Sequence, residues 1–172
     1  MSPLSSPVLA AAVLLILTGV PKIYRPGGTV VALRGLGVGK GSTAVARLIG
    51  VAECGIGVGA LVVGGRWLNC AVAAAYAGFA IVLVLLLRRG VESCGCSSSE
   101  QTPPTISHLV LVIALAGAAA GAAFTEPVRG IATLGSPGVG LTIAVFGLGA
   151  VAGWLAWAVV SLLPELVAQK AR

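Results

Sequence analysis

The chain contains five stretches that are long enough and apolar enough to cross a lipid bilayer as helices. A spanning helix needs about 20 predominantly apolar residues, because lipid offers no partners for unpaired backbone N–H and C=O groups. Only 9% of the residues are charged, against about 25% in a soluble domain, and 58% are hydrophobic. We therefore expect a polytopic, all-α membrane helical bundle that forms one transmembrane domain over residues 1–172. The spans run from about Leu4 to Tyr24, Thr43 to Val63, Trp67 to Leu87, Ile106 to Phe124 and Val139 to Leu163.

The connection between the first two spans, residues 25–42, is rich in glycine and has an apolar side. It is expected to form a short helix lying at the membrane interface. Its sequence GLGVGKGST resembles a phosphate-binding loop, but Lys40 is followed by glycine and no strand precedes it, so we expect no nucleotide. No arginine-rich stripe interleaved with aromatic residues supports nucleic acid as a partner, which leaves the lipid bilayer. The apolar side consists of Val30, Val31, Leu33, Leu36 and Val38.

Basic residues are concentrated in alternate connections, and this asymmetry predicts the orientation of the spans. With five spans, the first and third connections and the C-terminal tail lie on one side and hold nine of the eleven lysines and arginines. The N-terminus is therefore expected outside the cell. The loop of residues 88–105 and the C-terminus are expected on the cytoplasmic side of the plasma membrane, the bacterial inner membrane. The nine residues are Lys22, Arg25, Arg34, Lys40, Arg47, Arg88, Arg89, Lys170 and Arg172, and the other two are Arg66 and Arg129.

Glu53 lies about halfway along the second span, where an ionisable side chain costs about 2.5–3.5 kcal/mol on insertion scales. Such a residue needs a partner or a function. Lys22, near the end of the first span, has a side chain long enough to reach inward toward it. A structural lock between the first two helices is the favoured interpretation. A proton relay or a substrate contact at Glu53 is the alternative.

The least apolar part of the chain, RRGVESCGCSSSEQTPP, holds Cys94 and Cys96 on either side of one glycine. A disulfide between them needs a tight turn, which Gly95 permits because it has no Cβ. A ring of this size is expected to be strained, so the two thiols suit redox exchange better than a permanent staple. A weaker alternative joins both thiolates with His108 as metal ligands. A third interpretation is that the thiols do no chemistry.

Pairs of glycines four residues apart recur within the spans and place two glycines on one helix face. We expect these faces to pack within the bundle, with contact to a second protein as the alternative. Cys54 and Cys70 are expected to be packing thiols rather than a disulfide, because their depths in the bilayer differ by about 10 Å. The glycine pairs are Gly55 with Gly59, Gly117 with Gly121 and Gly149 with Gly153.

Three segments resemble the DoxX-like membrane proteins, and resemble more closely the methylamine-utilisation protein MauE and its relatives. The end of the first span resembles theirs in LTGVPKIYRPGG, and the second span, with its glutamate, in RLIGVAECGIGVGALVVGG. The third span, with its Cys-Gly-Cys loop, resembles theirs in YAGFAIVLVLLLRRGVESCGC. The resemblance covers roughly residues 14–120, and the matching positions are Lys22, Glu53, Cys94 and Cys96.

The resemblance implies a four-helix DoxX-like core, to which the fifth span is an addition. It also implies a role in thiol–disulfide exchange or redox maturation of exported proteins, beside a thioredoxin-like partner or within a larger membrane complex. No cofactor is expected. The chain departs from its relatives at Ser97 and Ser98, where they often have an aromatic residue and a glycine, and this bears on the identity of the partner or substrate. Whether the protein is an enzyme stays open here, since a non-enzymatic subunit of a membrane complex and a small transporter using Glu53 are alternatives.

Overall fold

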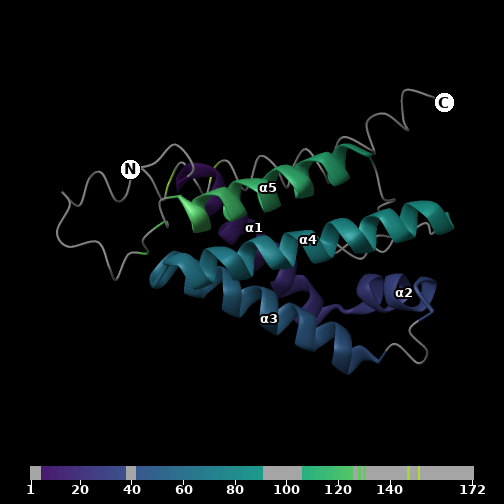
Figure 1. Cartoon of the computed structure of the whole chain (residues 1–172). Coiled ribbons are helices and arrows are strands. Elements are labelled where there is room, and N and C mark those ends of the chain that lie inside the picture. The colour runs from purple at the N-terminus through teal and green to yellow at the C-terminus, as the bar shows by residue number, and fades with distance from the viewer. Residues whose placement is uncertain are drawn as a thin grey trace.

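The computed structural model describes residues 5–37, 42–90 and 106–125, together with positions 128, 130, 147 and 151. Within these residues the chain forms five helices and no strand, and four of the helices are long and apolar enough to cross a membrane (Figure 1). The predicted all-α membrane bundle is therefore confirmed. The fifth predicted span, residues 139–163, lies outside the described residues except at positions 147 and 151. The helices are α1 (Ser5–Tyr24), α2 (Gly27–Gly35), α3 (Thr43–Val62), α4 (Arg66–Arg89) and α5 (Ile106–Phe124).

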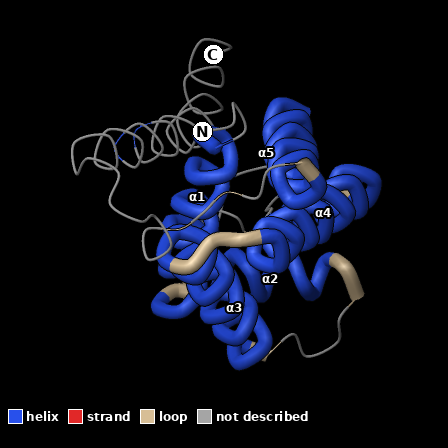
Figure 2. Tube along the Cα trace, turned by 60° about the vertical axis from the view of Figure 1, so that its left-hand side comes forward, coloured by secondary structure: helices blue, strands red, loops and turns tan. Residues whose placement is uncertain are grey.

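The four long helices pack mainly as two pairs, α1 with α3 and α4 with α5, and α1 also contacts α5 (Figure 2). The largest core cluster joins all four long helices, and its side chains Leu15, Val72 and Ala119 are fully buried. Large apolar side chains also cover the outside of the bundle, as at Leu48 and Val110, which are more than 60% exposed. This arrangement suits lipid as the surrounding solvent, because lipid tails are as apolar as the side chains that face them.

Glycines allow α1 and α3 to approach closely. A Cβ atom at Gly57 would lie 2.7 Å from the backbone oxygen of Ala12, and one at Gly50 would lie 2.7 Å from that of Gly19. Any larger side chain at these positions would push the helices apart. A Cβ atom at Gly55, by contrast, would have no neighbour within 4 Å. The close contact therefore uses glycines seven residues apart on α3, and Gly55 does not take part in it.

The short helix α2 packs against the last turns of α4. Ala32 forms a small second core with Leu83 and Leu86 of α4. The inward side of α2 carries small residues, and Val31 of the predicted apolar side is 44% exposed. The small inward residues are Gly28, Thr29 and Ala32, and their size lets the α2 backbone lie close to α4. We call this part of the molecule, where α1 and α4 end and α3 and α5 begin, the α2 end.

The opposite end of the bundle is closed by the tight turn between α3 and α4. Gly64 and Gly65 adopt positive φ angles of 66° and 94°, which favour glycine. The segment after α5 pairs with this turn, because Gly65 N–H donates to the Val128 oxygen at 2.8 Å and Gly130 N–H donates to the Val63 oxygen at 3.1 Å. This isolated bridge fastens the chain beyond α5 to the connection between α3 and α4.

Exposed aromatic side chains mark both ends of the spanning helices. Trp67 and Phe124 are 85% and 73% exposed at the opposite end, and Tyr24 is 77% exposed at the α2 end. Aromatic residues concentrate where the hydrocarbon meets the headgroups. Along α4, the distance from Trp67 to Arg88 is about 32 Å at ~1.5 Å per residue, close to the thickness of the hydrocarbon core. The two ends of the bundle therefore lie at the two membrane surfaces.

Candidate functional site

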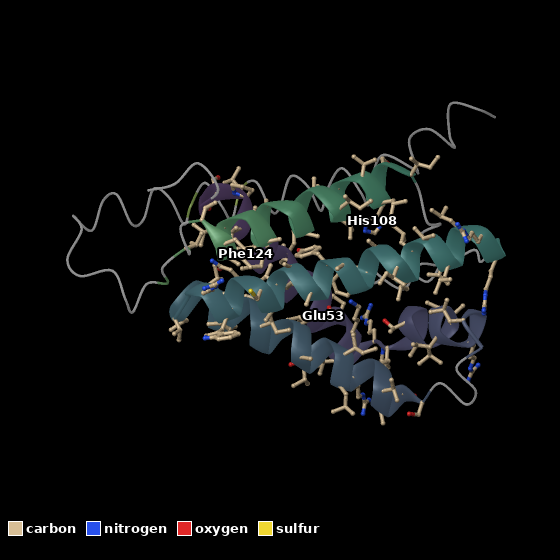
Figure 3. The ribbon with its side chains drawn as sticks, in the orientation of Figure 1. Glu53, His108 and Phe124 are labelled. Carbon is tan, nitrogen blue, oxygen red and sulfur yellow. The ribbon has the colours of Figure 1, made fainter. Side chains whose placement is uncertain are left out.

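The candidate site lies between α1 and α3, about halfway along α3, where Glu53 is only 3% exposed (Figure 3). Lys22 of α1 is 6% exposed and supplies the opposite charge. Thr18 precedes Lys22 by four residues, so both side chains leave the same face of α1. Gly19 and Gly50 bring the two helices close at this level, which is why a lysine and a glutamate on different helices can meet directly.

Lys22 binds both oxygens of the Glu53 carboxylate. Its Nζ atom lies 2.5 Å from Oε1 and 2.7 Å from Oε2. The Thr18 hydroxyl lies 3.3 Å from Oε2 but only 2.9 Å from the backbone oxygen of Leu14. A hydroxyl has one proton to donate, so Thr18 can serve only one of these acceptors at a time. Lys22 is therefore the main partner of Glu53, and the threonine is a secondary one.

An aromatic pair from α4 covers the ion pair. The Lys22 Nζ atom lies 5.0 Å from the centroid of the Phe79 ring, within range of a cation–π interaction. Phe79 meets Tyr76 edge to face, with ring centroids 5.7 Å apart. The Tyr76 hydroxyl donates to the backbone oxygen of Ala11 at 2.8 Å, which ties α4 to α1. The site thus connects three helices through side chains.

The Lys22–Glu53 pair has no net charge, whereas a single charge buried at this position would be costly. Glu53 is the one carboxylate within the part of the chain that the structure describes. Burying a charge costs several kcal/mol, and an oppositely charged partner in good geometry offsets most of that cost. The two ions are therefore mutually dependent, because each leaves the other uncompensated if it is removed.

The family model for Methylamine utilisation protein MauE matches residues 3–125 of this chain, more than two-thirds of its length. The chain belongs to the MauE family. The MauE match begins before α1 and ends just after α5, so it contains the four spanning helices and the Lys22–Glu53 pair. Searches of the curated proteins and of the solved structures found no match. The resemblance drawn from the three sequence segments is confirmed, and the MauE region extends further toward both ends than those segments.

The structure brings together two of the residues that the sequence singled out. Lys22 and Glu53 are in contact, whereas Cys94 and Cys96 lie outside the described residues. His108, the third member of the alternative metal site, is a buried residue in the first turn of α5 (Figure 3). No group of three His, Cys, Asp or Glu side chains that could hold a metal occurs within the described ranges.

Two further cysteines of this MauE protein are separate, free thiols in the described helices. The Cys54 Sγ atom lies 4.0 Å from the backbone oxygen of Ile16 and faces Gly19, so it fills the narrow gap between α1 and α3. Cys70 is half-buried in the first turns of α4. The two thiols form no disulfide with each other, as the sequence predicts.

Sequence reasoning missed three polar or aromatic residues of the MauE core. Thr18 had a usable signal, since it stands one helical turn before Lys22. Phe79 had none, because its contact with Lys22 depends on how α4 packs. Asn69, near the start of α4, is 1% exposed, and no hydrogen-bond partner for its side-chain amide occurs in the described structure. A buried amide without partners costs about 1–3 kcal/mol.

Proposed function

We propose that this multi-pass MauE-family protein takes part in thiol–disulfide exchange that supports redox maturation of exported proteins. The exchanging pair is Cys94 and Cys96, held in a single transmembrane domain. The N-terminus lies outside the cell, and the Cys-Gly-Cys loop and the C-terminus lie in the cytoplasm. The observation that carries the proposal is the family membership combined with two cysteines one residue apart, directly after the third spanning helix.

The exchange balances without a cofactor. One thiolate of the pair attacks a disulfide of the partner, forms a mixed disulfide and releases one partner thiolate. The second thiolate attacks the mixed disulfide and releases the other, so the partner gains two electrons and Cys94 and Cys96 become a disulfide. The two protons lost from the pair are taken up by the partner's thiolates. A thioredoxin-like dithiol restores the pair by the same two steps.

The end of α4 provides a fixed starting point for the loop. The last turn of α4 is anchored by Leu86, which is fully buried, and by Arg89, whose Nη1 donates to the Gly35 oxygen at 2.9 Å. Gly90 ends the helix with a φ of 62°. Arg88 and Arg89 stand within a few residues of the cysteines, and positive charge favours the thiolate form that attacks disulfides. These features support exchange at the loop.

In this proposal the Lys22–Glu53 pair is a structural lock. Lys22 binds both carboxylate oxygens, an arrangement that favours a permanent link between α1 and α3 over a proton relay. The transporter alternative makes a separate prediction for Glu53→Gln. If that variant assembles normally in the membrane but loses transport of a proton or cation, Glu53 has the transport role and the lock is wrong.

Differential alkylation in intact cells tests the redox proposal. Intact cells are treated with one thiol reagent, and the protein is then reduced and treated with a second reagent of different mass. The mass of the peptide that contains Cys94 and Cys96 is measured by mass spectrometry. We expect a mixture of reduced and oxidised pairs that shifts on addition of an oxidant. Cys54→Ser and Cys70→Ser are the matched controls. If both thiols stay reduced throughout and the Cys94→Ser/Cys96→Ser variant has no phenotype, the redox proposal is wrong.

Assembly with a larger membrane complex is the second candidate function. It is favoured by Gly55 of α3 and Gly117 of α5, which have no neighbour within 4 Å and leave their helix faces open in the described bundle. Small residues on open faces admit a partner helix. Purification of the tagged chain in mild detergent, with Gly55→Leu and Gly117→Leu as comparison variants, tests this. Loss of a specific co-purified membrane protein in either variant supports assembly, and an unchanged set of proteins counts against it.

A further inference from the structure

Exposed arginines gather at the α2 end of the bundle. Within the described residues, five arginines lie at this end and one, Arg66, lies at the opposite end, and all six are exposed. The described carboxylate, that of Glu53, is buried and already bound to Lys22. No carboxylate of the described helices therefore neutralises this end. The five residues are Arg25, Arg34, Arg47, Arg88 and Arg89.

Three of these arginines stand at the adjoining ends of α2 and α4. The Arg89 Nη1 atom donates to the Gly35 oxygen at 2.9 Å, so the last turn of α4 lies beside the last turn of α2. Arg34 directly precedes Gly35, and Arg88 directly precedes Arg89. The bond to Gly35 also satisfies a carbonyl group that a helix leaves unpaired at its C-terminus. We refer to Arg34, Arg88 and Arg89 as the arginine cluster.

The outward side of α2 combines this charge with an apolar contact surface. Val31 is 44% exposed and stands three residues before the exposed Arg34, so both side chains lie on the same side of the helix. An apolar side chain next to a cationic one is the pattern of helices that lie in the membrane interface. A phospholipid presents the same two chemistries in order, an acyl chain and then a phosphate.

The position of α2 places this side at headgroup depth. Ala32 and Leu36 pack against Leu83 and Leu86, which belong to the last turns of the spanning helix α4 (Figure 1). The nearby segments outside the described residues do not reverse the charge. Residues 38–41 add one lysine, and residues 91–105 add two glutamates, against the five arginines.

We propose that the arginine cluster and the outward side of α2 bind the headgroup of an anionic phospholipid. The guanidinium groups of Arg34 and Arg88 hold the phosphate, because planar guanidinium matches two phosphate oxygens at once. Arg89 keeps its bond to Gly35 and adds charge, while Val31 contacts the acyl chain. This inference goes beyond thiol exchange and does not depend on it.

Native mass spectrometry of the full chain in a neutral detergent tests this binding. The protein is titrated with phosphatidylglycerol or with phosphatidylcholine of the same acyl chains, and lipid adducts are counted. We expect tighter binding of phosphatidylglycerol, weakened about fivefold for each arginine removed in Arg34→Gln/Arg88→Gln. That variant leaves the Arg89–Gly35 bond intact. Arg66→Gln, at the opposite end, should bind as the unmodified chain does, and Arg34→Lys/Arg88→Lys should retain most of the preference because it keeps the charge.

Several outcomes overturn the proposal. Equal binding of the two lipids excludes a site for an anionic headgroup, and an equal loss in Arg66→Gln shows that only net charge matters. Displacement of phosphatidylglycerol by inorganic phosphate at millimolar concentration shows a general anion site rather than a lipid site. Binding of a soluble acidic protein at this end, with no lipid preference, shows a protein interface. A helical circular dichroism spectrum for each variant ensures that these comparisons are made on folded protein.

Discussion

The Nζ atom of Lys22 lies 2.5 Å from Oε1 of Glu53 and joins α1 to α3 at a depth where an isolated charge is expensive. The pair lies beneath Phe79 of α4, so one contact involves three of the four spanning helices. Both partners are almost completely buried. Because the energy of each ion depends on the other, the pair is a strong constraint on helix register even where its net contribution to stability is small.

Breaking the pair from one side should be far more damaging than removing it. We expect Glu53→Leu or Lys22→Met to lower the free energy of unfolding by about 3–5 kcal/mol, because each leaves an uncompensated buried charge. The double variant Lys22→Met/Glu53→Leu should recover most of this loss. Unfolding in mixed detergent micelles, followed by circular dichroism, measures all three. Losses that simply add in the double variant would show that the two side chains act independently.

Two glycines of the same helix should respond oppositely to alanine. Gly57→Ala places a Cβ 2.7 Å from the Ala12 backbone oxygen, so we expect it to push α1 from α3 and to cost about 1–3 kcal/mol. Gly55→Ala meets nothing and should be neutral or stabilise by up to about 1 kcal/mol through helix propensity. Thermal unfolding in detergent compares them. Equal destabilisation by both substitutions would contradict the close α1–α3 contact.

The buried amide of Asn69 should be dispensable for stability. Its Oδ1 and Nδ2 atoms have no partner in the described part of the chain, so replacing it by leucine, which is similar in size, removes an unpaired polar group. We expect Asn69→Leu to raise the free energy of unfolding by about 1–3 kcal/mol. Val72→Leu, one turn further along the same buried face, is the control for overpacking. Destabilisation by Asn69→Leu alone would mean that the amide has a bonded partner in the folded protein.

The bridge beyond α5 should depend on Gly130. A Cβ atom there would collide with the backbone of Val62 and Val63, so we expect Gly130→Ala to break the bond from its own N–H to the Val63 oxygen. The Gly65 amide donates to the Val128 oxygen in the same bridge, so its hydrogen should then exchange with solvent more than tenfold faster. A tenfold change corresponds to a fall of about 1.4 kcal/mol in the free energy of opening the bridge. Hydrogen exchange read by mass spectrometry measures this. Gly147→Ala, at a position with no neighbour within 4 Å, is the control and should leave the exchange rate unchanged.

The membrane class and the first four spans could be predicted from the sequence because they depend on local properties. A bilayer accepts only segments that satisfy their own backbone hydrogen bonds over about 20 residues, so hydropathy alone marks α1, α3, α4 and α5. Few residues can partner a buried charge within the membrane, and Lys22 was the candidate within reach of Glu53. Family resemblance came from the same short segments, and the match over residues 3–125 confirmed it.

Which faces of the helices meet was decided by the tertiary structure. The sequence predicted that Gly55 and Gly59 pack within the bundle. Gly59 lies against Leu68 of α4 and Gly55 meets nothing, while the close approach to α1 uses Gly50 and Gly57. The sequence also predicted an apolar side of α2 that includes Val31, but not that small residues of α2 would pack inward while Val31 stays exposed. The physical reason is that lipid and protein interior are equally apolar, so hydrophobicity does not distinguish inward from outward positions in a membrane helix. Close contact of backbones, the shape of small residues and the pairing of a few polar groups make that choice, and these depend on neighbours far away in the chain.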